Sequence, residues 1–219
     1  ESSATQAEWE YPESKLRTEA LIQREHGNIP VAILRIAGIY DEHCHSIPIA
    51  QQVRRIYEKD FESFFFPGNS DHGQSFVHLD DVVDCIGNAI AQRDALEPWQ
   101  VFLVGEPDTM SYAELQHQIG EQLHGKHWPA IRIPKPIAKA GAWVQDKLAA
   151  DEDEPFIKPW MVDLADAHYP VDPSKAIEKL GWHPNHSLRD TLPEILSRLK
   201  IDPQQWYREN KLPMPAELQ

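Results

Sequence analysis

The chain has 219 residues, 41% hydrophobic and 26% charged, so it is long enough to bury a sizeable core and short enough for one domain with an added lobe. Its 35 acidic residues outnumber its 21 Lys and Arg residues, and the formal net charge of -14 argues against non-specific binding to nucleic acid or an anionic membrane. Apolar runs stay well short of the roughly 18 residues that a membrane-spanning helix needs. Cys44 and Cys85 are too few for a disulfide framework or a CxxC metal site, so we expect a cytoplasmic globular protein.

Helices and apolar strands alternate along the first half of the chain. The first residues look like the end of a buried strand, so we expect that an amino-terminal portion of the protein precedes Glu1. Pro12 suits the first turn of a helix over 12–26, and the β-branched run 31–36 is typical of a strand covered on both faces of a parallel sheet. Further helices are expected over 47–59, 82–90 and 112–124, and further strands over 61–66, 75–79 and 100–104.

Capping residues mark the starts of two of these helices. Asp80 or Asp81 can cap the helix 82–90. Ser111 and Glu114 have the spacing of a capping box, which predicts the start of the helix 112–124. The alternation of apolar strands with such helices indicates an α/β fold.

Beyond Gly125 the character of the chain changes, because prolines interrupt it and helices dominate. The acidic run 151–154 is expected to be a solvated loop, and the segment from Asp202 a tail that carries Trp206 and Tyr207 and then becomes irregular around Pro213 and Pro215. The sequence therefore predicts a mostly helical carboxyl-terminal lobe, with helices near 137–149, 158–167, 173–180 and 187–200.

Three polar side chains near the start of the chain suggest catalysis. A free phenol has a pKa of about 10, so tyrosine is a poor base at neutral pH until its anion is stabilised. Lys15 lies four residues after Tyr11, on the same helical face, and its charge and the helix amino terminus both favour a phenolate. Tyr11 could then exchange a proton with a substrate oxygen while hydride moves at the same carbon. The Ser3 hydroxyl, at a strand end, is placed to orient that oxygen.

The Tyr-x-x-x-Lys spacing also occurs at Tyr207 and Lys211. That second match lies in a proline-rich tail with no strand after it, so we treat it as chance. The first match is distinguished by its context, with Ser-Ser-Ala-Thr upstream, a capped helix around it and a buried strand downstream. The alternative for Tyr11 and Lys15 is an amphipathic pair on an ordinary helix face.

These segments together resemble the carboxyl-terminal portion of an extended or atypical short-chain dehydrogenase/reductase, the family of NAD-dependent epimerases and dehydratases. The matches occur in order from residue 2 to about residue 195. They comprise SSAT (2–5), Tyr11 with Lys15, LRIAGIY (34–40), FVHLDDV (76–82), VFLVG (101–105) and KLGWHP (179–184).

The resemblance implies an architecture. The chain would contribute the distal part of a Rossmann-type parallel sheet, joined to a mostly helical substrate-binding lobe. The segments would divide into a nucleotide-binding part at 1–40 and 77–105, a lobe at 41–76 and 106–201, and a tail at 202–219.

The resemblance also implies an activity, the NAD(P)-dependent oxidation and reduction, or epimerisation, of a small alcohol or carbonyl substrate. Ser3, Tyr11 and Lys15 would be catalytic, and Lys15 would also contact the nicotinamide ribose. The cofactor would be NAD or NADP, because the residue that reads the ribose 2′ position falls in the expected missing portion. A homodimer is common in the family. The other implied site residues are Ile36 and Ala37 for the cofactor, and Gln74 and His78 for the substrate.

Two departures from the family pattern leave alternatives open. None of the ten glycines falls at GxGxxG spacing, so these residues supply no cradle for a cofactor pyrophosphate. Gln74 stands where sugar-nucleotide enzymes usually carry an arginine, so a nucleotide pyrophosphate would lose a bidentate partner. A non-catalytic dinucleotide-sensing or scaffold protein, or an inactive carboxyl-terminal fragment, would share the same fold.

Three other residue groups invite a functional interpretation. The run His43-Cys44-His45 lacks the spaced fourth ligand of a structural zinc site, so no metal is expected there. His78 is expected to stabilise a turn by hydrogen bonding. The run Phe64-Phe65-Phe66 is expected to pack against the sheet or to line the substrate cleft.

Overall fold

The computed structural model describes residues 10–148 and 161–219 and confirms the predicted α/β fold. Its strands form three parallel pairs, β1 (Val31–Ile36) with β5 (Trp99–Val104), β2 (Gly38–Tyr40) with β4 (Phe76–His78), and β3 (Phe65–Pro67) with β6 (Ile131–Ile133). Short 3₁₀ helices occupy Phe61–Phe64, Arg93–Ala95 and Ala216–Leu218. The α-helices are α1 (Glu10–Glu25), α2 (Ile47–Tyr57), α3 (Leu79–Ala91), α4 (Tyr112–His124), α5 (Lys135–Leu148), α6 (Met161–Leu164), α7 (Ser174–Leu180), α8 (Leu188–Ile201) and α9 (Pro203–Glu209).

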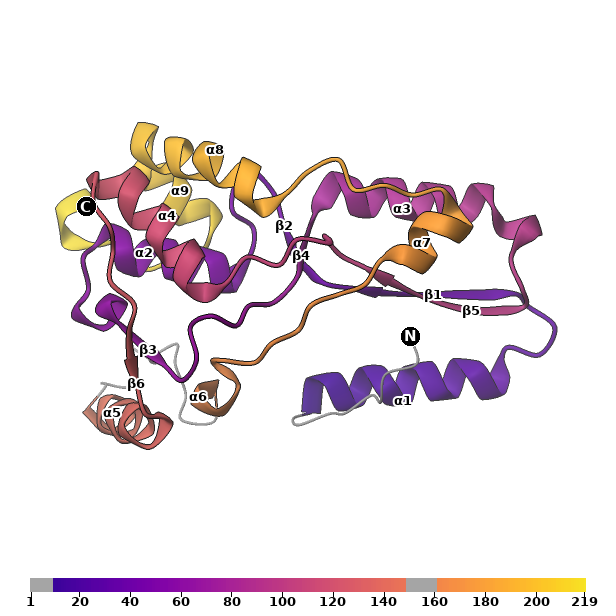
Figure 1. Cartoon of the computed structure of the whole chain (residues 1–219), viewed down its shortest axis with the longest axis horizontal. Helices are drawn as coiled ribbons and strands as arrows, with labels where there is room; N and C mark the ends of the chain where they lie inside the picture. Colours follow the sequence, from indigo (N-terminus) through magenta and orange to yellow (C-terminus); the bar gives the residue numbers. More distant parts are fainter. Residues whose placement is uncertain (1–9, 149–160) are drawn as a thin grey trace.

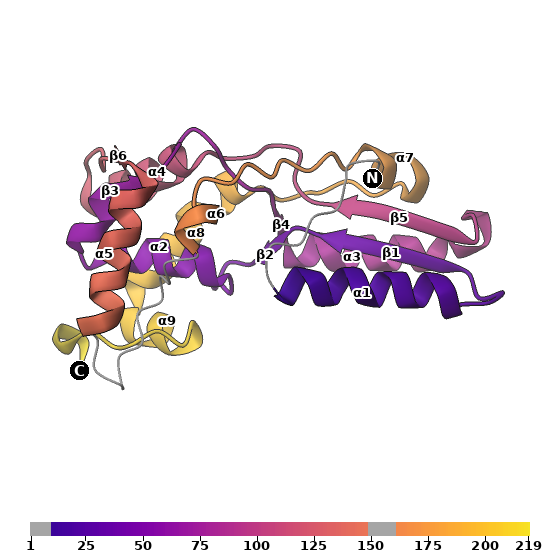
Figure 2. The same cartoon turned by 90° about the horizontal axis from the view of Figure 1, so that it is seen from below.

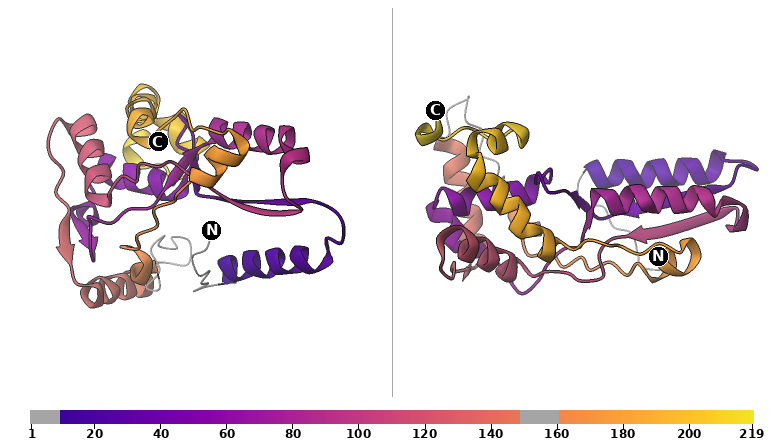
Figure 3. Two further views of the ribbon diagram at one scale, coloured as in Figure 1. Left: turned by 45° about the vertical axis from the view of Figure 1, so that its right-hand side comes forward. Right: turned by 90° about the horizontal axis from the view of Figure 1, so that it is seen from above.

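The described elements gather into two ends joined by the pair β2 and β4 (Figure 1). One end holds β1 and β5, with α1 and α3 on opposite sides of the strands (Figures 1 and 2). The other end is the lobe that contains α2, α4, α8 and α9 together with β3 and β6. Helix α8 runs from the junction outwards to α9 (Figure 3). This arrangement places the carboxyl ends of β1 and β5 towards the lobe.

Each end has its own hydrophobic core. The core of the lobe is built mainly from the inward faces of α2, α4, α8 and α9, and it includes Ile49, Ile119 and Leu192. The core of the sheet end includes Val77 from β4, Phe102 and Val104 from β5, and side chains from α3 and α7. Burial of these apolar side chains holds each end together.

Strand β1 forms where the sequence predicts it, and its register runs from Val31 opposite Trp99 to Ile36 opposite Val104. The expectation that both faces of this strand are covered is wrong for the described residues, because no β1 side chain is fully buried. Within the described residues β1 has β5 as its one partner strand.

Among the described helices, none is both long enough and apolar enough to cross a bilayer.

The predicted division into a nucleotide-binding part, a lobe and a tail stays a prediction, and packing differs from it in two places. Helix α7 and Trp182 pack in the core of the sheet end and not in the lobe. Gly181 ends α7 with a φ of 64°. The indole of Trp182, the next residue, donates to the Asp81 carbonyl oxygen (2.8 Å). The segment expected as a tail begins with α9, which buries Trp206 in the core of the lobe.

Two local expectations also need correction. The residues 61–66, expected as a strand, begin as a 3₁₀ helix, and the strand β3 starts only at Phe65. Helix α3 is capped by His78, whose ring nitrogen accepts the Asp80 backbone N–H (3.2 Å), and not by Asp80 or Asp81. The capping box predicted for α4 is present as expected.

Candidate functional site

Helix α1 carries the predicted catalytic pair on one face. The Lys15 ammonium nitrogen lies 5.0 Å from the centroid of the Tyr11 ring, so the structure brings these two side chains together. Tyr11 is 66% exposed. Ser3 lies outside the described residues, and its predicted role stays a prediction.

An ion pair ties helix α1 to strand β1. The Arg35 guanidinium on β1 donates to both carboxylate oxygens of Glu19 on α1, at 2.7 and 3.1 Å, and both side chains are half-buried. Two parallel hydrogen bonds between a guanidinium and a carboxylate fix direction as well as distance. Glu19 lies one helical turn beyond Lys15, so this contact positions the helix face that carries Tyr11 and Lys15. This ion pair was not predicted from the sequence, although Arg35 within an otherwise apolar run is a signal that could have indicated it.

The predicted cofactor residues lie at the carboxyl end of β1. Ala37 donates its backbone N–H to the Val104 carbonyl oxygen (2.8 Å), which continues the pairing of β1 with β5. The Ile36 side chain, next to it, is exposed. Ligands of open α/β sheets bind outside the carboxyl ends of the strands, so this position is compatible with the predicted role. The contact with a nicotinamide carboxamide stays a prediction.

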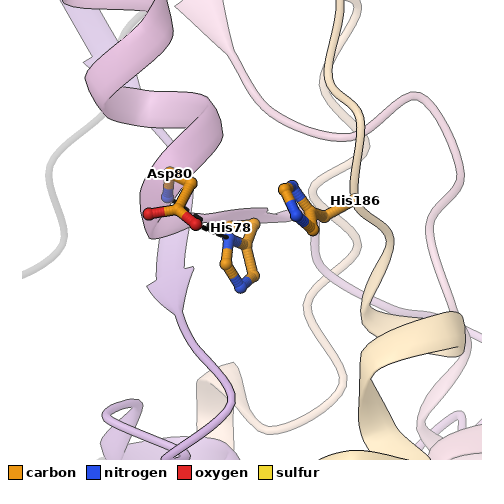
Figure 4. Close-up of side chains that lie close together, drawn as sticks. All are labelled: His78, Asp80 and His186. Atoms are coloured by element: carbon orange, nitrogen blue, oxygen red, sulfur yellow. Dashed lines mark hydrogen bonds and ion pairs between the residues drawn. The ribbon is translucent and has the colours of Figure 1, made fainter.

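His78 and Gln74, the predicted substrate residues, lie in different surroundings. Gln74 lines a cavity in the lobe. His78 is fully buried at the end of β4, where it caps α3 as the sequence analysis anticipated for a histidine that stabilises a turn. Figure 4 shows its imidazole facing that of His186, and the two ring centroids are 4.1 Å apart.

The histidine pair and Asp80 could offer three metal-ligand atoms within 4.8 Å of one another. One nitrogen of His78, however, already accepts the Asp80 backbone N–H, and its other nitrogen faces Glu42 at 3.5 Å. A metal ion bound through the first nitrogen would break the cap of α3. The positions of these three side chains are therefore explained by His78 capping α3 and by the His186 imidazole stacking on it.

Two buried carboxylates fix the junction between the sheet end and the lobe. Asp81 accepts the backbone N–H groups of Asn185 (2.9 Å) and His186 (3.0 Å), and Glu106 accepts that of Leu188 (2.9 Å) at the start of α8. Burial raises the pKa of Glu106, although the Leu188 hydrogen bond opposes this effect. These bonds hold the first turn of α8 against the ends of β4 and β5, so the lobe has a defined position relative to the strands.

A cavity of about 310 Å³ lies in the lobe, and the sequence analysis did not anticipate its shape. Phe65 and Phe66 line it, in agreement with one of the two roles expected for the phenylalanine run. Phe64 instead stacks on Trp128, with ring centroids 4.9 Å apart. The wall is completed by residues from α2, α4 and the segment 162–165, which are far apart in the sequence.

The second Tyr-x-x-x-Lys match is structurally unlike the first. Tyr207 is fully buried in the core of the lobe and donates its hydroxyl hydrogen to Glu58 (2.6 Å). Helix α9 ends before Lys211, whose φ of 54° takes it off the helical path. The second match therefore does not place a phenol and an ammonium on one helical face, as the sequence context indicated.

No protein-family model matches the chain, and no curated protein sequence matches it. Solved structures do match. The UDP-glucuronic acid 4-epimerase of Bacillus cereus, in complex with NAD, is 18% identical with a TM-score of 0.60, over 87% of this chain and 52% of that one. The chain shares the fold of the epimerases and dehydratases. This result confirms the fold that the sequence resemblance implied.

Two further structures support the same fold. The dTDP-glucose 4,6-dehydratase of Streptomyces venezuelae, with NAD bound, is 20% identical with a TM-score of 0.58, over 92% of this chain and 51% of that one. A protein named RMD from Pseudomonas aeruginosa, complexed with NADPH, is 15% identical with a TM-score of 0.58, over 88% of this chain and 56% of that one. The chain thus spans about half the length of these epimerase and dehydratase-fold proteins.

Proposed function

We propose that the intact protein is an NAD(P)-dependent oxidoreductase or epimerase/dehydratase-like enzyme that acts on an alcohol or carbonyl group through Ser3, Tyr11 and Lys15. The observation that carries the proposal is the Tyr11–Lys15 pair on α1, in a fold whose solved examples include complexes with NAD and NADPH. The ion pair between Arg35 and Glu19 supports it, because it links this helix to β1, whose end carries the proposed cofactor residues.

The residues present fit one part of such a cofactor. Lys15, Ile36 and Ala37 would hold the nicotinamide half, while the glycine spacing needed for the pyrophosphate is not found in these 219 residues. The pyrophosphate would be held by a part of the intact protein outside them. When bound, the nicotinamide supplies the acceptor or donor of hydride.

The proposed chemistry of the chain is proton transfer at the substrate oxygen. In oxidation, Tyr11 would take the hydroxyl proton while the carbon loses hydride, which leaves a carbonyl group. In reduction, it would return the proton to the same oxygen. Lys15 would stabilise the tyrosine anion through its positive charge, and the Ser3 hydroxyl would donate a hydrogen bond to the substrate oxygen.

A cofactor titration tests the proposal, with the second motif as its control. NADH and NADPH are titrated into the full-length protein and binding is followed by nicotinamide fluorescence. Lys15→Met should weaken binding by about tenfold or more, because it removes a charge beside the ribose, whereas Lys211→Met should leave it unchanged. Equal effects of the two substitutions, or no binding of either dinucleotide, would contradict the proposal.

A turnover assay tests the role of Tyr11. Tyr11→Phe removes one hydroxyl from an exposed side chain, so the fold should be kept and turnover of any accepted alcohol or ketone should be abolished. The assay follows the nicotinamide absorbance. Dinucleotide binding with no turnover of a wide substrate panel would instead favour the sensing or scaffold alternative, and full activity in Tyr11→Phe would exclude this tyrosine as the acid/base.

A further inference from the structure

The cavity in the lobe has apolar walls. Phe66 and Tyr112 stand at one side with their rings stacked, 5.0 Å between centroids, and Phe76 and Met110 add further apolar surface. Its volume of about 310 Å³ lies at the small end of the range of about 300–1,000 Å³ that is common for ligand pockets. Such walls suit a single small molecule with a ring or another compact apolar body.

Among the described residues that line this cavity, one is a cation, Arg55 on α2. Its guanidinium donates to the Gln52 side-chain oxygen (2.6 Å), and its Nε is buried and has no hydrogen-bond partner within residues 10–148 and 161–219. Desolvation lowers the pKa of Arg55, although the charge of Glu62, which also lines the cavity, opposes this effect. An arginine stays protonated in proteins, so a positive charge faces the cavity with a neutral amide as its partner.

A chain of amides holds this charge in place. Gln52 donates its side-chain N–H to the Gln116 oxygen (2.8 Å), and Gln116 in turn donates to the carbonyl oxygens of Ser63 (2.8 Å) and Pro129. These bonds orient the Gln52 oxygen towards Arg55. The guanidinium is thereby fixed before any ligand arrives, which lowers the entropy cost of binding.

We propose that this cavity binds a small apolar molecule with a ring and one carboxylate, the carboxylate on Arg55 and the ring against Phe66 and Tyr112. Arg55 is half-buried, and although the charges of Glu62 and Asp60 act on it, its Nε has no hydrogen-bond partner among the described residues. A ligand carboxylate would supply that partner through charge-assisted hydrogen bonds. A nucleoside diphosphate fits less well, because it needs more than one cation and Gln74, at the cavity wall, is neutral. If this ligand is the substrate of the enzyme, that conclusion rests on the proposed function. The binding of the ligand to the cavity does not depend on the proposed function.

Calorimetric titration with matched probes tests this proposal without any cofactor. The probes are trans-cinnamate, its uncharged analogue cinnamamide, and UDP. Cinnamate should bind at least about tenfold more tightly than cinnamamide, and UDP more weakly than cinnamate. Arg55→Gln should remove the preference for the acid, whereas Arg54→Gln, the same change at a neighbour that does not line the cavity, should keep it.

A second variant keeps the test decisive if Arg55→Gln fails to fold. Ala165→Phe fills the cavity while retaining Arg55, and it should abolish cinnamate binding with circular dichroism unchanged. The proposal is wrong if cinnamate does not bind at millimolar concentration, if cinnamamide binds equally well, or if UDP binds more tightly. Since these titrations involve neither Tyr11 nor a dinucleotide, their failure is distinguishable from a failure of the proposed catalytic role.

Discussion

Two helical glycines should respond in opposite ways to the same substitution. A Cβ at Gly120 on α4 would lie 2.2 Å from Trp128 Cβ and 3.2 Å from its Cα, whereas a Cβ at Gly87 on α3 would meet nothing within 4 Å. Trp128 cannot easily retreat, because it is buried, stacks on Phe64 and donates its indole N–H to the Ser63 hydroxyl (3.1 Å).

The magnitudes follow from two opposing effects. Alanine in place of glycine in a helix interior stabilises a protein by about 0.5–1 kcal/mol, which is the whole effect expected for Gly87→Ala. Overpacking costs about 1–3 kcal/mol, and a clash with atoms next to the backbone belongs in the upper half of that range. We therefore expect Gly120→Ala to lose about 1–2 kcal/mol and the two variants to differ by about 2–3 kcal/mol.

Urea denaturation followed by far-UV circular dichroism measures both variants against the parent protein. Equal slopes of the three unfolding transitions would show that the midpoints report stability. If Gly120→Ala unfolds at the same urea concentration as the parent protein or at a higher one, the close approach of α4 to Trp128 is wrong. A loss of stability in Gly87→Ala would instead show that the outer face of α3 is covered.

Three further changes have defined outcomes. Ser111→Ala removes the capping box of α4 and should cost about 1 kcal/mol, measured by the same denaturation. Trp182→Phe removes the indole N–H that donates to the Asp81 carbonyl oxygen and opens a void, and it should cost about 2–4 kcal/mol; a change under about 0.5 kcal/mol would contradict the burial of this indole. Burial raises the pKa of Asp41, but hydrogen bonds from the His45 backbone and ring and the His43 backbone outweigh it and leave the pKa below its usual value. Asp41 therefore stabilises the folded state above a pH of about 4, and this stability is lost as the pH falls through the lower pKa of the folded state. Asp41→Asn should reduce the pH dependence of the free energy of unfolding in this range, measured by acid unfolding.

Local signals in the sequence predicted the elements whose causes are themselves local. Ser111 and Glu114 predicted the start of α4 because both partners of a capping box lie within one helical turn. The β-branched run predicted β1 for the same kind of reason. The sequence predicted Asp80 or Asp81 as the cap of α3 because carboxylates are common caps. In the structure, His78 at the end of β4 accepts the Asp80 backbone N–H instead.

The candidate site was predictable only in part. Tyr11 and Lys15 are four residues apart, so helix geometry alone brings them together. The cavity is lined by side chains such as Arg55, Phe66 and Val162, which are far apart in the sequence. They come together only in the folded lobe, so no local sequence pattern predicts the cavity. The packing of Trp182 in the core of the sheet end likewise depends on residues that are distant in the sequence.

Helix α1 contributes no buried side chain, and the Arg35–Glu19 contact links it to its strand. A segment with so little apolar anchoring opens at a lower free energy than either core. Dissolved ions weaken such a charged link far more than they weaken apolar packing. Raising the salt concentration should therefore loosen α1 from β1 before either hydrophobic core unfolds, so the position of the proposed acid/base depends on ionic strength in a way that the two cores do not.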